Sequence, residues 1–143
     1  MQERTVSTAA GLPETIRDMT AADVVDVAVQ LASLRDHKAD GIFAEAYEGN
    51  FWASKASTCI AAGLARVYVV NRGGPCGAVL AQADTMNPGR AVLWACNSMW
   101  GPSAEAAMLE DAKAWADSRG LQLGRMVAQT KMVPQTVREW QPL

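Results

Sequence analysis

The sequence predicts one α/β (α+β) domain with a mixed central sheet and helices on both faces, and three observations support this. Half of the 143 residues are hydrophobic, which is enough to fill the core of a single domain. Three short apolar segments joined by turn sequences run from Val67 to Cys96, as in an antiparallel meander. The helical segment Ser103–Arg119 then leads to another apolar segment, and a crossover of that length lets the two flanking strands be parallel.

The first part of the chain is expected to contain a strand and a helix after a polar lead-in. Residues 1–12 are predicted to be a mobile lead-in to one domain at 13–143. Glu14–Asp18 is expected to form the first strand. Thr20–Asp23 follows with a Thr-x-x-Asp sequence, which is typical of the start of a helix.

The remaining elements complete the order β-α-α-β-β-β-α-β-α. They are a helical region over 41–65 broken near 48–50, strands over 67–70, 77–83 and 91–96, a helix over 103–119, a strand over 121–128 and a last helix. Asn71–Pro75 and Met86–Gly89 are turn sequences, and Gly120 stops the long helix. Pro134 suits the first turn of the last helix, where Trp140 is expected to line a ligand groove or a subunit contact.

Charge and composition argue against several classes of protein. A net charge of -2 provides no basic field for a nucleic-acid backbone or an anionic membrane. No segment approaches the roughly 20 apolar residues that span a bilayer, and the first residues lack the apolar stretch of a secretory signal. Three widely spaced cysteines favour a reducing, cytoplasmic location over a disulfide framework. The single histidine, His37, and the lack of a Cys-x-x-Cys pair predict no metal site.

The segment Trp94–Glu105 carries the main functional signal, because a strand, a short loop and a helix start follow one another there. The first amides of a helix have no partner within it, and the helix dipole adds positive potential, so such an end can bind a phosphate. Gly101 permits unusual backbone angles, Pro102 suits a first helical position, and Ser103 can either cap the helix or bind an anion. From spacing alone, an ordinary strand-to-helix connection is the more frequent explanation.

Three fragments in this order resemble the GNAT acyltransferase superfamily, in particular its phage and bacterial members. Thr15–Asp23 resembles the opening strand and first helix start, Ala65–Ala83 the hairpin before the cofactor site, and Met108–Leu121 the main cofactor helix. The resemblance covers residues 15 to about 130. It implies a GNAT-like fold and acyl transfer from acetyl-CoA to an amine of a small molecule or a protein, with coenzyme A as the product.

The same resemblance implies where the cofactor binds. The third meander strand and the strand after the cofactor helix would separate, and the pantetheine arm would pair with the main chain near Trp94–Asn97. The residues implied for cofactor binding are Ala95, Cys96, Asn97, Ser98, Met99, Trp100, Gly101, Pro102, Ser103, Ala104 and Glu105.

The candidate catalytic residues are Glu45, Tyr47 and Asn97. Glu45 would act as a base through a water, although a solvated helix carboxylate is the simpler interpretation. Tyr47 would supply the acid, and Asn97 would bind the oxyanion or satisfy the backbone of its own loop. Cys96 is expected to be a small core residue, because no activating base is near it in sequence.

The sequence departs from the family pattern in ways that favour an alternative function. The family loop usually reads Gln/Arg-x-x-Gly-x-Gly/Ala, and Trp100, Ser103 and Glu105 stand at those three places. A carboxylate at 105 would repel phosphates. Residues 132–140 contain no tyrosine, the residue that often protonates the leaving thiolate in the family. The alternative is a catalytically inactive GNAT-like module that binds CoA or another protein, with a homodimer as one form.

Overall fold

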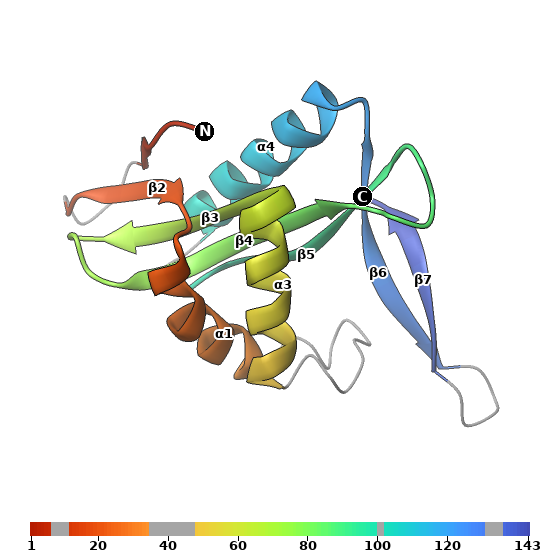
Figure 1. The fold of residues 1–143 in the computed structure, drawn as a ribbon. Helices are drawn as coiled ribbons and strands as arrows, with labels where there is room; N and C mark the ends of the chain where they lie inside the picture. The colour runs from red at the N-terminus through yellow and green to blue at the C-terminus, as the bar shows by residue number, and fades with distance from the viewer. Residues whose placement is uncertain (7–11, 35–47, 100–101, 131–135) are drawn as a thin grey trace.

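A seven-stranded sheet in the order β1-β2-β3-β4-β5-β6-β7 forms the centre of the molecule (Figure 1). The computed structural model describes residues 1–6, 12–34, 48–99, 102–130 and 136–143. The strands are β1 (Arg4–Val6), β2 (Glu14–Asp18), β3 (Gly63–Val70), β4 (Pro75–Ala83), β5 (Arg90–Ser98), β6 (Gln122–Thr130) and β7 (Thr136–Pro142). Within these residues the helices are a 3-10 turn (Ala21–Asp23), α1 (Val24–Ala32), α3 (Gly49–Ala62) and α4 (Pro102–Ser118).

The sheet is mixed, because one of its strand pairs is parallel. β5 and β6 run in the same direction, with α4 between them in the chain, and every other neighbouring pair is antiparallel. β3, β4 and β5 are consecutive antiparallel neighbours, as expected for strands joined by short turns. The predicted α+β class with a mixed sheet is therefore confirmed.

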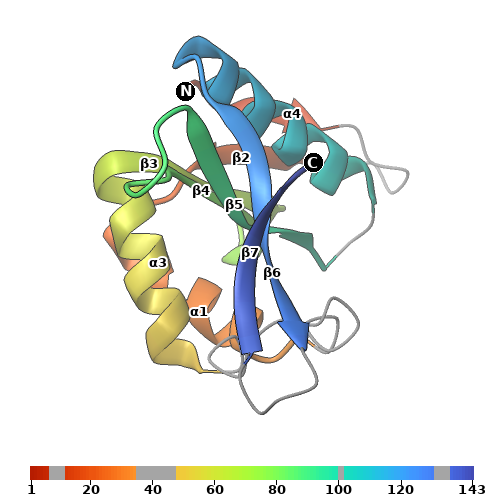
Figure 2. The same cartoon turned by 90° about the vertical axis from the view of Figure 1, so that its right-hand side faces the viewer.

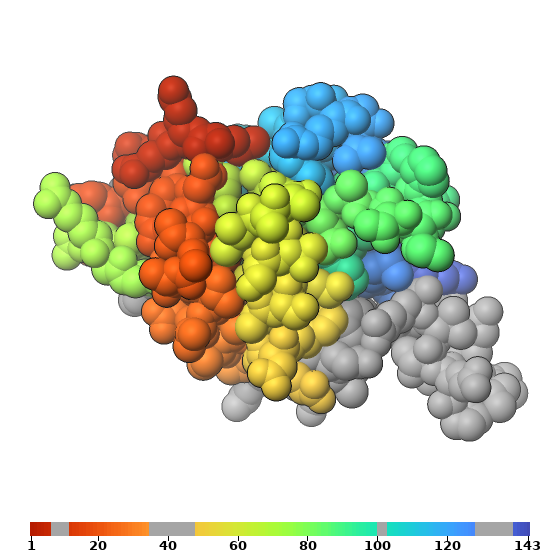
Figure 3. Space-filling view, in the orientation of Figure 1, coloured from red at the N-terminus to blue at the C-terminus, as the bar shows by residue number. Residues whose placement is uncertain are grey.

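The hydrophobic core has two parts, and the residues of β3 and β4 alternate between them. Val67 and Leu80 pack with α1 and α3, whereas Tyr68 and Val79 pack with α4. Because successive side chains of a strand point to opposite faces, the continuous apolar runs of these two strands serve both parts. Figure 2 shows these strands between α4 and the pair α1 and α3, and Figure 3 shows α1 and α3 side by side on the surface.

Local sequence signals account for several element boundaries. The Asp23 carboxylate accepts a hydrogen bond from the Thr20 backbone N–H (2.8 Å), which confirms the predicted helix start. Arg17 donates two hydrogen bonds to the same carboxylate, and these hold the pKa of Asp23 below its ordinary value. Gly120, with a φ of 66°, ends α4 in a left-handed conformation that glycine adopts without steric cost.

The structure differs from the sequence-based expectation at the N-terminal end. Arg4–Val6, within the expected lead-in, forms strand β1 and pairs with β2. Two side chains anchor this short strand: Val6 is buried in the core beside α4, and the Arg4 guanidinium donates to Asp111 Oδ1 (2.7 Å) and Glu110 Oε2 (3.2 Å) on α4. These contacts are distant in sequence, so no local pattern announces the strand.

The structure also differs at the C-terminal end, where a helix was expected. Thr136–Pro142 forms strand β7, antiparallel to β6, and Pro134 lies outside the described residues. Trp140 therefore lies on a strand and not on a helix, and its indole N–H donates to the Ala91 carbonyl on β5 (2.9 Å). Pairing with β6 and the long-range hydrogen bond of Trp140 outweigh the weak helical spacing of apolar residues in this segment.

Candidate functional site

β5 and β6 separate after only three residue pairs. The parallel pairing joins Arg90 to Gln122, Ala91 to Leu123 and Val92 to Gly124. Both strands then continue without pairing to each other, β5 to Ser98 and β6 to Thr130. Figures 1 and 2 show the two strands diverging from this point. We call the diverging segments 93–98 and 125–130 the fork, and the three pairs before them its vertex.

A β-bulge lies at the start of the fork. Leu80 of β4 pairs with Ala95 and Ala81 pairs with Leu93, so Trp94 is an extra residue in β5. Bulges bend a strand and re-aim its main chain, and they are frequent beside functional sites. Beyond the bulge, β4 is the only strand that pairs with β5, so the other edge of β5 is not used by the sheet within the described residues. An extended ligand can pair with such an edge as an added strand.

The indole of Trp140 crosses the vertex. Trp140 lies on β7 opposite Met126 of β6, and its ring reaches over Gly124 to the carbonyl of Ala91. A Cβ on Gly124 would overlap this ring, so only glycine leaves room for it. The guanidinium of Arg90 lies over the ring, 4.4 Å from its centroid. One side chain of β7 therefore contacts both strands at the place where they part.

The turn after β5 uses its amides within the protein. The Ser98 N–H donates to Glu105 Oε1 (3.0 Å), and the Met99 N–H donates to the Cys76 carbonyl (2.8 Å). These two amides are therefore already bonded within the protein and are not free to bind a phosphate. Glu105 stands in the first turn of α4, where the helix dipole favours a negative charge, and this position brings its carboxylate back to the end of β5.

The implied cofactor-binding residues are distributed over the fork and the first turn of α4. Ala95, Cys96, Asn97 and Ser98 are half-buried on β5, whereas Met99 and Ser103 are exposed. Ala104 is buried in the core, so its side chain cannot contact a ligand. The residues that lie outside the described part are Glu45, Tyr47, Trp100 and Gly101.

Two ionisable side chains, Cys96 on β5 and Tyr68 on β3, are unsuited to act as a nucleophile or an acid. Burial, with a further contribution from the Glu105 carboxylate, raises the pKa of Cys96 to about 12, so almost no thiolate exists at neutral pH. Burial and a hydrogen bond with Glu14 raise the pKa of Tyr68, whose side chain is fully enclosed. Tyr68 therefore does not supply an acid to a ligand in the fork.

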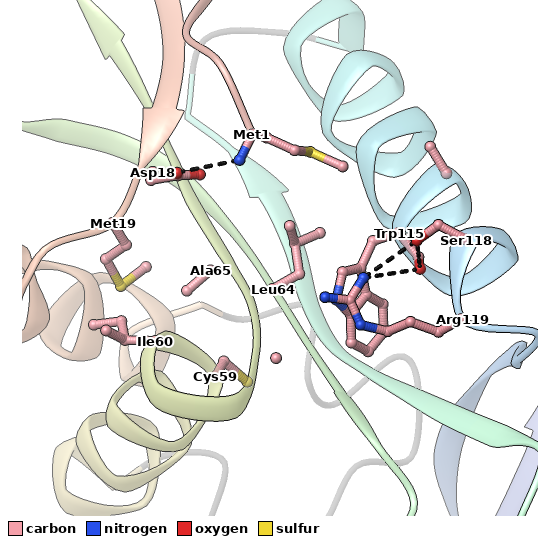
Figure 4. A pocket seen from close by; sticks show the side chains of 12 residues that line it. Met1, Asp18, Met19, Cys59, Ile60, Leu64, Ala65, Trp115, Ser118 and Arg119 are labelled. Carbon is pink, nitrogen blue, oxygen red and sulfur yellow. Dashed lines mark hydrogen bonds and ion pairs between the residues drawn. The ribbon is translucent and has the colours of Figure 1, made fainter.

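A separate cleft of about 510 Å³ lies at the other end of α4 (Figure 4). It is lined by residues from β2, β3 and the ends of α3 and α4, including Asp18, Cys59, Ile60, Leu64, Trp115 and Arg119. Its charged groups are engaged within the protein. Asp18 accepts from the Met1 ammonium (3.4 Å) and from Arg66 (2.7 Å), and Arg119 donates to Ser118 Oγ (3.2 Å). This cleft is not part of the fork.

Sequence reasoning missed the bulge at Trp94 and the contact of Trp140 with the vertex. A bulge is a mismatch between two strands, so it has no signature in one of them alone. Gly124 did carry a signal, because a glycine inside a strand often marks the close approach of another group. The glycine indicates only that another group comes close to the strand, and only the folded structure identifies that group as Trp140.

No model of a known protein family matches the chain, and a search of curated proteins finds no match either. Among the residues that the structure describes, no three His, Cys, Asp or Glu side chains cluster closely enough to hold a metal ion. None of the helices in those residues is long and apolar enough to cross a membrane.

Proposed function

We propose that this protein is an acyl-CoA-dependent N-acyltransferase that holds the pantetheine arm of its donor in the fork. The supporting observation is the separation of the parallel strands β5 and β6 directly after Val92 and Gly124, with a bulge at Trp94. Pantetheine is an extended chain with two amide groups, so it suits the unused edge of β5. The resemblance of three sequence fragments to the GNAT superfamily, with helices on both faces of its sheet and a crossover through the cofactor helix, points to the same place.

The reaction would be direct transfer of the acyl group. The amine nitrogen of the acceptor attacks the thioester carbonyl carbon, a C–N bond forms, and the C–S bond breaks. A base takes a proton from the amine, and the coenzyme A thiolate takes up a proton as it leaves. The protein would act mainly by holding both reactants in contact and by stabilising the oxyanion, for which Asn97 is the candidate on β5. Glu45 and Tyr47 are the proposed base and acid.

Calorimetry combined with hydrogen exchange tests this proposal. Acetyl-CoA, coenzyme A and ATP, an unrelated nucleotide, are titrated into the protein. We expect saturable binding of the first two and none of ATP. Binding should slow amide exchange over 93–98 and 125–130, while the amides of β2 serve as the internal control. Absence of CoA binding, or protection confined to other segments, would overturn the proposal.

The hydrogen bonds at the end of β5 favour a second candidate function. Because the Ser98 and Met99 amides already have acceptors and Tyr68 is buried, the chain also suits a GNAT-like module that binds CoA or a protein partner without catalysis. Release of free thiol, measured with acetyl-CoA and a panel of small and peptidyl amines, separates the two functions. Binding without thiol release favours the module, and thiol release favours the enzyme.

A further inference from the structure

Among the residues that the structure describes, three contacts of the Trp140 ring involve the vertex of the fork. Its indole N–H donates to the Ala91 carbonyl (2.9 Å), its face receives the Arg90 guanidinium (4.4 Å), and its edge occupies the space above Gly124. Residues 90 and 91 belong to two of the three β5–β6 pairs, and Gly124 belongs to the last pair before the strands separate. The ring therefore bridges β5 and β6 only where they meet.

β6 and β7 form a two-stranded arm beyond the vertex. They pair from Gly124 with Pro142 to Thr130 with Thr136, whereas β6 pairs with β5 only up to Gly124. Figure 1 shows the two strands running together away from β5. A two-stranded ribbon is marginally stable on its own, so its direction relative to β5 depends on its contacts with the rest of the molecule, which include those at its base and the packing of Met126 against the core beside α1 and α3.

A small rotation at the vertex is amplified along the arm. The segment from Gly124 to Thr130 extends about 20 Å at the rise of an extended strand. A rotation of about 10° at the vertex therefore moves its far end by roughly 3–4 Å. A displacement of about 1 Å can reduce a rate on the order of a hundredfold where reactants are positioned for direct transfer.

We infer that Trp140 is a positioning residue: by bridging β5 and β6 across Gly124, it sets the direction in which the fork opens. Its structural effect stands independently, and its effect on the donor rests on the proposed function. Trp140 does not touch the reacting atoms in this arrangement. It acts through the two strands that would hold the pantetheine arm.

Trp140→Phe tests the inference, because phenylalanine keeps an aromatic ring and loses the N–H that binds Ala91. A matched control exists in Trp115→Phe. Trp115 is buried where Trp140 is half-buried, and it also carries an arginine over its ring (Arg119, 5.1 Å), but its indole N–H has no acceptor among the described residues. Both substitutions replace an indole by a phenyl ring, but Trp140→Phe also removes a hydrogen bond at the vertex.

Hydrogen exchange and coenzyme A affinity are measured for the wild type and both variants, at a temperature where all three are folded. In Trp140→Phe we expect the amides of 90–92 and 122–124 to exchange about fivefold faster, relative to the amides of β2 and β3. We expect the Kd for coenzyme A to rise by a similar factor. Trp115→Phe should lower the melting temperature without either effect.

Gly124→Ala provides a second route to the same result, because the added methyl displaces the Trp140 ring. We expect faster exchange at the vertex again, and a combined effect with Trp140→Phe that is smaller than the sum of the two, since both disturb the Trp140 contact while the added methyl also meets the Gln141 carbonyl. Unchanged exchange at the vertex in both single variants would overturn the positioning role. If the wild type does not bind coenzyme A, the proposed function falls, and the exchange data still decide the role of Trp140.

Discussion

Among single residues, Glu105 bears most directly on how a cofactor would bind. Its carboxylate accepts the Ser98 N–H (3.0 Å) at the start of α4, where a diphosphate would seek the same kind of donor. Two anions cannot share one amide hydrogen, and their like charges repel at short range. Binding of a diphosphate at this turn therefore requires the Glu105 carboxylate to leave, whereas a ligand confined to the fork does not.

Glu105→Gln tests whether the Glu105 charge opposes the diphosphate of the ligand. Glutamine can still accept a hydrogen bond from the Ser98 N–H but carries no charge. We expect coenzyme A to bind on the order of tenfold more tightly to the variant, and pantetheine, which has no diphosphate, to bind equally to both proteins. The variant should be slightly less stable, since a negative charge at the helix N-terminus is lost. Calorimetry with both ligands and a thermal melt measure these effects.

Asp117→Asn is the control for that experiment, because Asp117 is an exposed carboxylate near the other end of the same helix. An equal gain in affinity in this variant would mean that net charge, and not the charge beside the Ser98 amide, limits binding. A weaker affinity in Glu105→Gln would instead show that Glu105 only supports the turn.

Among the elements, Arg66 of β3 joins three segments of the chain: the first residues, β2 and α4. It stands fully buried on β3, where it donates to Asp18 Oδ1 (2.7 Å) and the Ile16 carbonyl (3.0 Å) on β2, and to the Gln2 carbonyl (2.7 Å). Its Nε lies 3.0 Å from Asp111 Oδ2 on α4, close enough for charge attraction but outside hydrogen-bond geometry. The guanidinium therefore connects the N-terminal strands to α4.

Arg66→Met should destabilise the fold by about 3 kcal/mol, because it leaves buried Asp111 with fewer cationic partners. Urea unfolding measures the loss. The double variant Arg66→Met/Asp111→Leu should recover much of it, since a buried charge pair is often replaceable by apolar side chains of similar volume. Lys113→Met, an exposed change on α4, should stay within about 0.5 kcal/mol of the wild type. No recovery in the double variant would mean that Asp111 is held by Arg4 alone.

The elements that the sequence predicted have local causes, and those it missed depend on distant contacts. Thr20–Asp23 predicted a helix start because the hydrogen bond that makes it lies within four residues, and Gly120 predicted a helix end for a similar reason. β7 was missed because Trp140 is held by Ala91 and Gly124, which no local pattern contains. In the candidate site, the separation of the strands around 93–98 was anticipated through the family resemblance, whereas the Glu105 contact with Ser98 was not.

The molecule as a whole has two core regions, and we expect them to differ in how readily they open. Cys59 is fully buried on α3, in the core beside α1, and Cys96 is half-buried on β5, beside α4 and the fork. Burial raises the pKa of both thiols to about 12. Neither thiol is appreciably ionised in the folded state, so labelling of either one requires an opening, and a difference in labelling rate reports how each region opens.

We expect an alkylating reagent at pH 8 to modify Cys96 faster than Cys59 in a Cys76→Ser background, which removes the third thiol. Cys96 lies where β5 has lost its pairing with β6, so a local opening should suffice, whereas Cys59 should require global unfolding. Urea distinguishes the two routes, because the effect of urea scales with the surface that an opening exposes. The Cys59 rate should therefore rise steeply with low urea concentrations and the Cys96 rate only weakly. Equal steep slopes would show instead that the fork opens only when the entire domain unfolds, and that it is as rigid as the rest of the sheet.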